Sequence, residues 1–223
     1  MKTDLNIKKD VLDEIAWNPR LKNADISVDV YNGTVTLEGI CESYAKKIAA
    51  ERTAMRVGGV KKIVNNVEVR LPSKIEMNDA ALEKNILYTL KWSASVPEET
   101  IRVHVRNGWV TIEGNVEFEF QKRAITRIVT DMSGVMGITN SVVIASDAAT
   151  TFELKDKISV ALKRNISSGE KINITVEGDK VILSGKVHSI TEWFVAEQVA
   201  WAAPGINTVE NRLEVSQEEA LVQ

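Results

Sequence analysis

Residues 31–39 of this chain have the sequence Tyr31-Asn32-Gly33-Thr34-Val35-Thr36-Leu37-Glu38-Gly39. The stretch recurs at 106–114 as Arg106-Asn107-Gly108-Trp109-Val110-Thr111-Ile112-Glu113-Gly114, and at 177–185 with Gly178-Asp179 at its centre. An Asn-Gly pair between alternating apolar residues is a strong local signal of a β-hairpin, because a two-residue turn needs positive φ. The sequence therefore predicts the same hairpin three times.

Other positions recur at fixed distances from each hairpin. A glycine ends the hairpin, a second glycine follows 20 residues later, and an asparagine comes six residues after that. The complete set of motif positions is Asn32, Gly33, Gly39, Gly59, Asn65, Asn107, Gly108, Gly114, Gly134, Asn140, Gly178, Asp179, Gly185, Gly205 and Asn211. A fixed period of this length indicates a repeat architecture. We expect three tandem repeats, at 1–72, 73–147 and 148–223.

Each repeat shows the same predicted order of elements. Apolar residues at helical spacing open the repeat, two alternating strands form the hairpin, and a second helix precedes a third strand. The second helices are expected at about 43–57, 118–132 and 189–203. The fold class is therefore α+β, with an αββαβ order and two helices over one face of a small sheet.

The two-residue turns also predict which side chains face each other across the hairpin. Arg106 lies opposite Trp109, which suits a cation–π contact, and Glu177 lies opposite Lys180, which suits an ion pair. The motif asparagines share the parity of the buried strand residues. An inward amide needs a hydrogen-bond partner, and we expect it to be a loop backbone.

Composition limits the classes of function. Lys and Arg total 28 against 31 Asp and Glu, a net charge of -3, which argues against nucleic acid as a partner. Residues 1–72 hold 12 basic and 10 acidic side chains, whereas residues 148–223 hold 8 and 11. This offset, from mildly basic to mildly acidic, suits head-to-tail contact between chains.

The sequence also gives an expectation about compartment. The single cysteine, Cys41, cannot form a disulfide within the chain. The first ten residues lack the apolar core of a signal peptide, and no apolar run approaches the roughly 18 to 20 residues that span a bilayer. The default expectation is a cytoplasmic protein without a transmembrane segment.

No catalytic or metal-binding constellation can be assembled from the sequence. The two histidines, His104 and His188, stand at positions that do not recur between repeats, and with Cys41 they form no metal-ligand pattern. Cys41 is interpreted as a small buried apolar residue. We expect no enzyme activity and no cofactor.

The tryptophans distinguish the repeats. Trp109 replaces Thr34 and Lys180, Trp193 replaces Lys47 and Lys122, and Trp201 replaces Met55 and Thr130. Large aromatics at positions that are polar elsewhere predict contacts between surfaces, either with a neighbouring repeat or with another chain. Trp109, Trp193, Trp201 and Arg106 are therefore the candidate protein interface. Trp17 and Trp92, which end the first helices, are expected in the cores.

The αββαβ order, the turn, the 20-residue step to Gly-Val and the following asparagine resemble the BON family, named for bacterial osmotically inducible periplasmic and nodulation proteins. The resemblance covers nearly the whole chain as three copies. It implies a binding module for phospholipid or cell-envelope partners, many of whose members are periplasmic.

Two hypotheses follow. The first is a non-enzymatic, stress-linked bacterial protein that self-associates, extending to head-to-tail filaments or tubes. The second is peripheral binding to anionic phospholipid, in which each basic residue near the surface contributes about 1 kcal/mol. The candidate lipid-binding residues all lie in the first repeat: Lys46, Lys47, Arg52, Arg56, Lys61 and Lys62.

Overall fold

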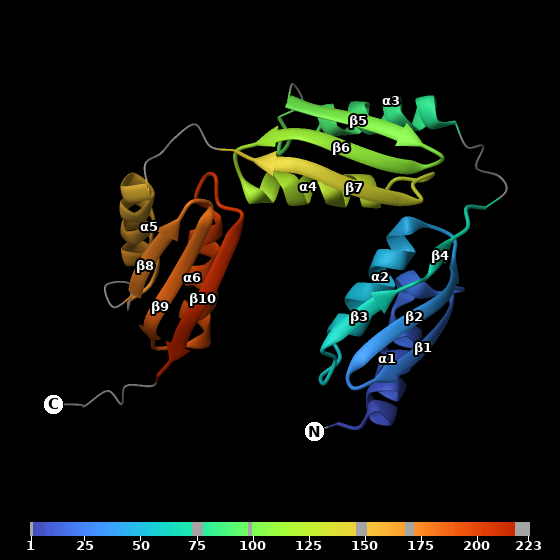
Figure 1. The fold of residues 1–223 in the computed structure, drawn as a ribbon, viewed down its shortest axis with the longest axis horizontal. Helices are drawn as coiled ribbons and strands as arrows, with labels where there is room; N and C mark the ends of the chain where they lie inside the picture. The colour runs from blue at the N-terminus through green and yellow to red at the C-terminus, as the bar shows by residue number, and fades with distance from the viewer. Residues whose placement is uncertain (1, 73–77, 98–99, 146–150, 168–171, 217–223) are drawn as a thin grey trace. The chain divides into compact units, whose positions relative to one another are not determined.

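The computed structural model describes residues 2–72, 78–97, 100–145, 151–167 and 172–216. It contains three small sheets, one in each predicted repeat, and confirms the α+β class. Figure 1 shows both helices of each repeat on the same side of its sheet. The other side of each sheet, called here the open face, carries no helix of its own repeat. Each repeat is described by itself.

Repeat 1 follows the predicted order, with its third strand in two pieces. Its elements are α1 (Asp4–Trp17), the short 3-10 helix η1 (Pro19–Leu21), β1 (Asp25–Tyr31), β2 (Thr34–Cys41), α2 (Tyr44–Met55), β3 (Lys62–Asn65) and β4 (Glu68–Val69). The central strand β2 pairs antiparallel with β1 and parallel with β3 and β4. The parallel pairing requires a crossover, and α2 supplies it.

Repeats 2 and 3 have an unbroken third strand. Repeat 2 comprises α3 (Asp79–Lys91), β5 (Ile101–Arg106), β6 (Trp109–Val116), α4 (Glu119–Thr130) and β7 (Gly137–Ile144). Repeat 3 comprises α5 (Thr151–Asn165), β8 (Ile172–Glu177), β9 (Lys180–Val187), α6 (Ile190–Trp201) and β10 (Thr208–Val215). The strand orders are β5-β6-β7 and β8-β9-β10, so the second strand is central in every repeat.

The hairpin turns explain why repeat 3 departs from the Asn-Gly pattern. Asn32 and Gly33 both have positive φ, at 51° and 77°, as a type I′ turn requires. In the turn of repeat 3, Gly178 alone has positive φ, at 61°, which fits a type II′ turn. The two turn types hold the same register, because Tyr31 pairs with Thr34 and Glu177 pairs with Lys180.

Alternation along the strands places the core between sheet and helices. In β8 every second residue is buried, and in β2 Val35 and Leu37 are fully buried. The core of repeat 1 joins these strand residues to Ile7, Val11 and Ile15 of α1. The repeat is small, so nearly all of its apolar burial comes from this single layer.

The motif asparagines bind the third strand to the second helix. The Asn65 amide donates to the Lys47 carbonyl at 3.0 Å, and the Asn211 amide donates to the Trp193 carbonyl at 3.1 Å. The side-chain oxygen of Asn211 accepts from the backbone N–H of Leu213 at 3.1 Å. The acceptor of Asn65 and Asn211 is thus a helix carbonyl and not a loop backbone, and Asn140 donates to the Thr126 hydroxyl of α4 at 2.7 Å.

A carboxylate at the start of the first helix holds the hairpin turn. Asp4 accepts from the backbone N–H groups of Asn32 at 2.7 Å and Gly33 at 3.0 Å. Asp79 does the same for the turn of repeat 2, at 2.7 and 2.9 Å. Each pair of bonds satisfies two turn donors and fixes the hairpin to the helix.

The prediction that Trp17 and Trp92 fill the cores is wrong. The side chains are 85% and 73% exposed. Each follows the last buried residue of its helix, Ile15 or Leu90, by two positions, which is about 200° around a helix with 3.6 residues per turn. Both indoles therefore point away from the sheet.

Candidate interaction surfaces

The open face of repeat 2 carries Trp109 at the start of β6. Its side chain is 52% exposed, and its indole Nε1 donates to the Thr139 hydroxyl at 2.8 Å. The ring lies over Gly137, where an added Cβ would come within 2.4 Å of a ring carbon. Only glycine at position 137 is therefore compatible with this orientation of the ring. These contacts with β7 take the place of the cation–π contact expected with Arg106.

Basic side chains lie beside this indole. Arg102, His104 and Arg106 alternate with buried residues along β5 and are all exposed. Among the ion pairs of the described residues, none includes Arg102 or Arg106. Glu113 of β6 is exposed on the same face, and by the register of the hairpin it lies opposite Arg102. The end of the face near the turn thus has a cationic character.

On the open face of repeat 3, two basic side chains pair with one carboxylate of the same sheet. Lys180 contacts Glu210 at 2.6 Å, and Arg212 contacts the same carboxylate at 2.6 Å. Hydrogen bonds from Arg212 and then Lys180 lower the pKa of Glu210 from 4.5 to about 2. Lys180 was expected to pair with Glu177 across the hairpin, but its ion-pair partner here is Glu210, on the parallel strand.

Trp193 and Trp201 pack against the core of their own repeat. Both are partly buried among the apolar residues of α6 and the sheet. The Trp193 indole donates to the Leu213 carbonyl at 3.1 Å, so it spans from helix to third strand. Packing within repeat 3 thus accounts for Trp193 at a position that is lysine in the other repeats.

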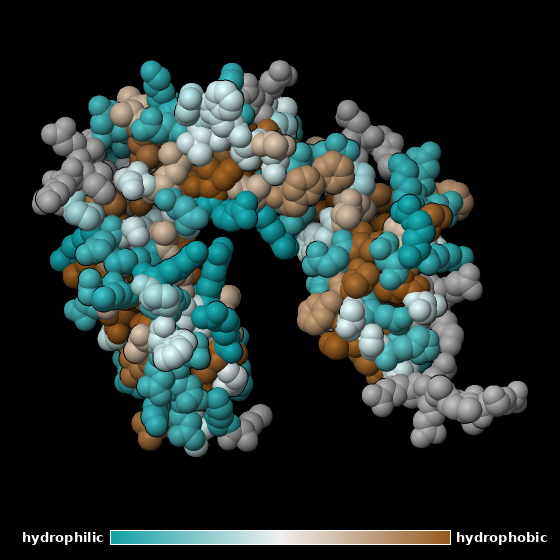
Figure 2. All heavy atoms as spheres, turned by 180° about the vertical axis from the view of Figure 1, so that it is seen from behind, coloured by the Kyte–Doolittle hydropathy of each residue, from teal (hydrophilic) through white to brown (hydrophobic). Residues whose placement is uncertain are grey.

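The exposed apolar side chains of α6 are different residues, Ile190 and Phe194, which stand one turn apart. Phe194 contacts Trp193 edge-on, with ring centroids 5.1 Å apart. Figure 2 shows apolar side chains reaching the surface of this repeat, which is the one ending in the grey C-terminal trace. The charged residues of α6 are Glu192 and Glu197, so the helix is apolar and acidic.

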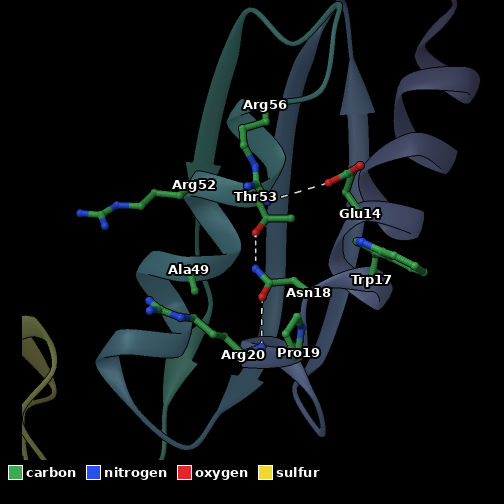
Figure 3. A pocket seen from close by; sticks show the side chains of 9 residues that line it. All are labelled: Glu14, Trp17, Asn18, Pro19, Arg20, Ala49, Arg52, Thr53 and Arg56. Atoms are coloured by element: carbon green, nitrogen blue, oxygen red, sulfur yellow. Dashed lines mark hydrogen bonds and ion pairs between the residues drawn. The ribbon is translucent and has the colours of Figure 1, made fainter.

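Repeat 1 contains an open cavity of about 620 Å³ where the end of α1 meets α2. Its floor includes a hydrogen bond of 2.8 Å from the Asn18 amide to the buried Thr53 hydroxyl. In Figure 3 the guanidinium groups of Arg20 and Arg52 extend to one side of this bond, and the Trp17 ring lies on the other. The cavity therefore combines an exposed indole with an arginine-rich wall.

The six candidate lipid-binding residues lie in different local surroundings. Lys46, at the start of α2, pairs with Glu42 at 2.8 Å. Arg52 and Arg56 line the cavity, and Arg56 lies 3.9 Å from Glu14. Lys61 lies against Gly33 of the hairpin turn, and Lys62 begins β3. The partly buried Lys47 supplies the carbonyl that Asn65 binds.

Cys41, the single thiol of the chain, is buried at the end of β2. Burial raises the pKa of this thiol, which favours the unreactive protonated form. Across the described ranges, no three His, Cys, Asp or Glu side chains are grouped to hold a metal ion. Among the helices described, none is long and apolar enough to cross a bilayer.

Several of these features were missed by sequence reasoning. Gly137 lets the Trp109 ring lie against β7, and the aligned residues in the other repeats are Lys62 and Thr208. Asp4 and Asp79 both begin a helix and both precede the turn asparagine by 28 residues. That matched spacing was a usable signal.

The fold and surfaces define a tandem array of small αββαβ domains that carry different side chains on a common scaffold. The BON domain profile matches residues 3–70, 78–146 and 146–217, so the chain belongs to the BON domain family.

The chain is also similar to the osmotically-inducible protein Y of Escherichia coli strain K12, with 28% identity over 124 residues. The alignment covers 54% of this chain and 62% of that protein, so the match spans less than two thirds of the relative.

Among solved structures, the chain matches the C-terminal domain of CdsD, a structural protein of the type III secretion system of Chlamydia trachomatis. Identity is 15% and the TM-score is 0.28, over 96% of this chain and 100% of that one. A second structure of CdsD matches at 16% identity with a TM-score of 0.26, over 94% and 93%.

Proposed function

We propose that this protein is a non-enzymatic, stress-linked interaction protein that self-associates head to tail. The Trp17 cavity of repeat 1 in one chain would bind α6 of repeat 3 in the next. The observation that carries the proposal is the 85% exposed Trp17 beside an arginine-lined cavity. An indole and arginines are the side chains most enriched at protein interfaces.

The second copy is the favoured partner because the two surfaces are complementary. Repeat 1 offers Trp17 with Arg20, Arg52 and Arg56. In the same chain, α6 offers the exposed Ile190 and Phe194, and its charged residues are both glutamates. Because the two surfaces belong to different repeats, one contact leaves a free surface at each end, and assembly continues as an open chain.

Native mass by light scattering across a concentration series tests the proposal. The wild type should grow in mass with concentration, and Trp17→Lys, which installs the residue of repeat 3 (Lys163), should stay monomeric. Phe194→Ala should have the same effect. The matched control is Trp92→Lys in repeat 2, where only one of the three arginines recurs. The residues aligned with Arg20, Arg52 and Arg56 are Ser95, Arg127 and Asp131.

Charge reversal gives a sharper version of the experiment. Arg52→Glu and Glu197→Arg should each weaken assembly, and the double variant should recover part of it, because opposite charges again face each other between chains. A wild type that remains monomeric at the highest concentration would refute self-association.

A second candidate function is binding to an anionic lipid surface by the same cavity. The observation in its favour is that an exposed indole and three arginines also suit a layer of phosphate headgroups. Co-sedimentation with phosphatidylglycerol vesicles, and with phosphatidylcholine vesicles as the neutral control, separates the two functions. Lipid binding predicts retention on the anionic vesicles alone, lost in the Arg52→Glu variant, whereas self-association predicts no retention on either.

A further inference from the structure

On the open face of repeat 2, the end next to the hairpin turn combines an ordered indole with basic side chains. It consists of His104, Arg106, Trp109 and Thr139, and we call it the turn-end patch. All four side chains are exposed. The aligned residues Asp29, Tyr31 and Thr34 in repeat 1, and Thr175, Glu177 and Lys180 in repeat 3, do not reproduce it.

The indole of the patch is held in one place. Gly137 leaves room for the ring to lie against the strand, and the 2.8 Å bond to Thr139 fixes its edge. Because the half-exposed ring is already ordered in the free protein, a ligand that stacks on it loses little free energy to ordering the side chain. Lys62 and Thr208 replace Gly137 where the indole is absent, so the glycine and the tryptophan occur together.

The cation of the patch is available. Arg106 has no ion-pair partner among the described residues. In repeat 3, by contrast, Glu210 occupies both Lys180 and Arg212 on the corresponding face. A free guanidinium binds a carboxylate through two parallel hydrogen bonds, which makes a carboxylate the natural ligand.

We propose that the turn-end patch binds an extended acidic peptide segment of a partner protein. Carboxylates would bind Arg106 and His104, and an aromatic or proline side chain of the peptide would stack on Trp109. Alternate residues of an extended peptide are about 6.6 to 6.8 Å apart, the same period that separates His104 from Arg106 along β5. A nucleic acid fits less well, because the patch offers few cations and the whole chain is acidic.

This inference concerns a different face from the helix surfaces of the proposed self-association. The two are tested by separate measurements, so the failure of one leaves the other standing. Native mass reports on Trp17 and Phe194, whereas peptide affinity reports on Arg106 and Trp109.

The test is the fluorescence anisotropy of a labelled peptide, Glu-Pro-Glu-Tyr-Glu-Pro-Glu, titrated with the full chain at low salt. We expect saturable binding that weakens about tenfold in Arg106→Glu and in Trp109→Thr, the residues of repeats 3 and 1. Arg106→Lys keeps the charge without the paired hydrogen bonds and should give an intermediate affinity. Tyr31→Ala, at the aligned position of repeat 1, is the matched control and should leave the affinity unchanged.

Thermal unfolding of each variant shows that a lost affinity is not lost folding, since Thr and Glu are already tolerated at these positions in the other repeats. A peptide with Gln in place of every Glu should not bind. The proposal is overturned if the wild type does not bind the acidic peptide, if Arg106→Glu and Trp109→Thr bind it as well as the wild type, or if single-stranded oligo-dT of equal charge binds more tightly.

Discussion

Repeats 2 and 3 share their strand order and turn position, yet their open faces differ in chemistry. In repeat 3, Lys180 and Arg212 converge on Glu210, so the charges are used within the sheet. In repeat 2, Trp109 lies over Gly137. Arg106 has no ion-pair partner among the described residues. The scaffold therefore fixes where side chains point, while a few substitutions decide whether the basic side chains of a face are paired within the sheet.

The largest effect should come from breaking the scaffold beneath the open face of repeat 2. Gly114 has φ +136°, and a Cβ there would lie 2.0 Å from the Thr100 carbonyl oxygen. Since the clash is with backbone, Gly114→Ala should lower the free energy of unfolding by about 3 kcal/mol or more. Urea unfolding measures this. The control is Gly58→Ala, whose Cβ would meet its nearest atom at 4.0 Å, and equal midpoints for the two variants would show that the backbone clash carries no cost.

A smaller effect should follow from removing the space under the Trp109 ring. Gly137→Ala would place a Cβ within 2.4 Å of the ring, so the indole must move, at a cost of about 1 to 3 kcal/mol. The loss should be non-additive with Trp109→Thr, because the three atoms nearest to the added methyl all belong to the ring that this second change removes. The indole N–H resonance of Trp109 in NMR spectra should shift toward that of a solvent-exposed indole. An additive pair of effects would show that the ring does not depend on Gly137.

The repeated features were predictable from sequence, and the repeat-specific contacts were not. The hairpin registers follow from the turn residues, because a two-residue turn places the residues directly before and after it opposite each other. The inward orientation of the motif asparagines follows from the alternation of buried and exposed residues along the strand. Both inferences need only local geometry and the spacing of the repeats.

The misplaced tryptophans show where local reasoning ends. Trp17 looks like a core residue by composition, but its position about 200° from Ile15 on the helix turns it outward. Trp193 looks exposed because lysines align with it, yet its indole reaches the Leu213 carbonyl, 20 residues away. Gly137 and Trp109 are 28 positions apart in sequence, so their dependence becomes visible only when β6 and β7 lie together.

The smallest effect concerns the acid titration of Glu210 on the open face of repeat 3. The folded pKa of Glu210 is depressed from 4.5 to about 2 by Arg212 and Lys180. A depressed carboxylate contributes stability that is present above its unfolded pKa and is lost as the pH falls from about 4.5 towards 2. Glu210→Gln should therefore flatten the pH dependence of unfolding in this window. The change should be slight, because the pair lies at the surface and is screened by solvent.

Arg106→Ala is the matched control for this titration, since it removes a basic side chain from the open face of repeat 2 without touching the Glu210 network. Urea midpoints measured from about pH 5 to about pH 2 should retain the wild-type slope in Arg106→Ala and lose part of it in Glu210→Gln. If both variants keep the full slope, the contacts of Lys180 and Arg212 with Glu210 do not persist in solution. The open face of repeat 3 would then hold free cations, as repeat 2 does, and the distinction between the two repeats would rest on Trp109 alone.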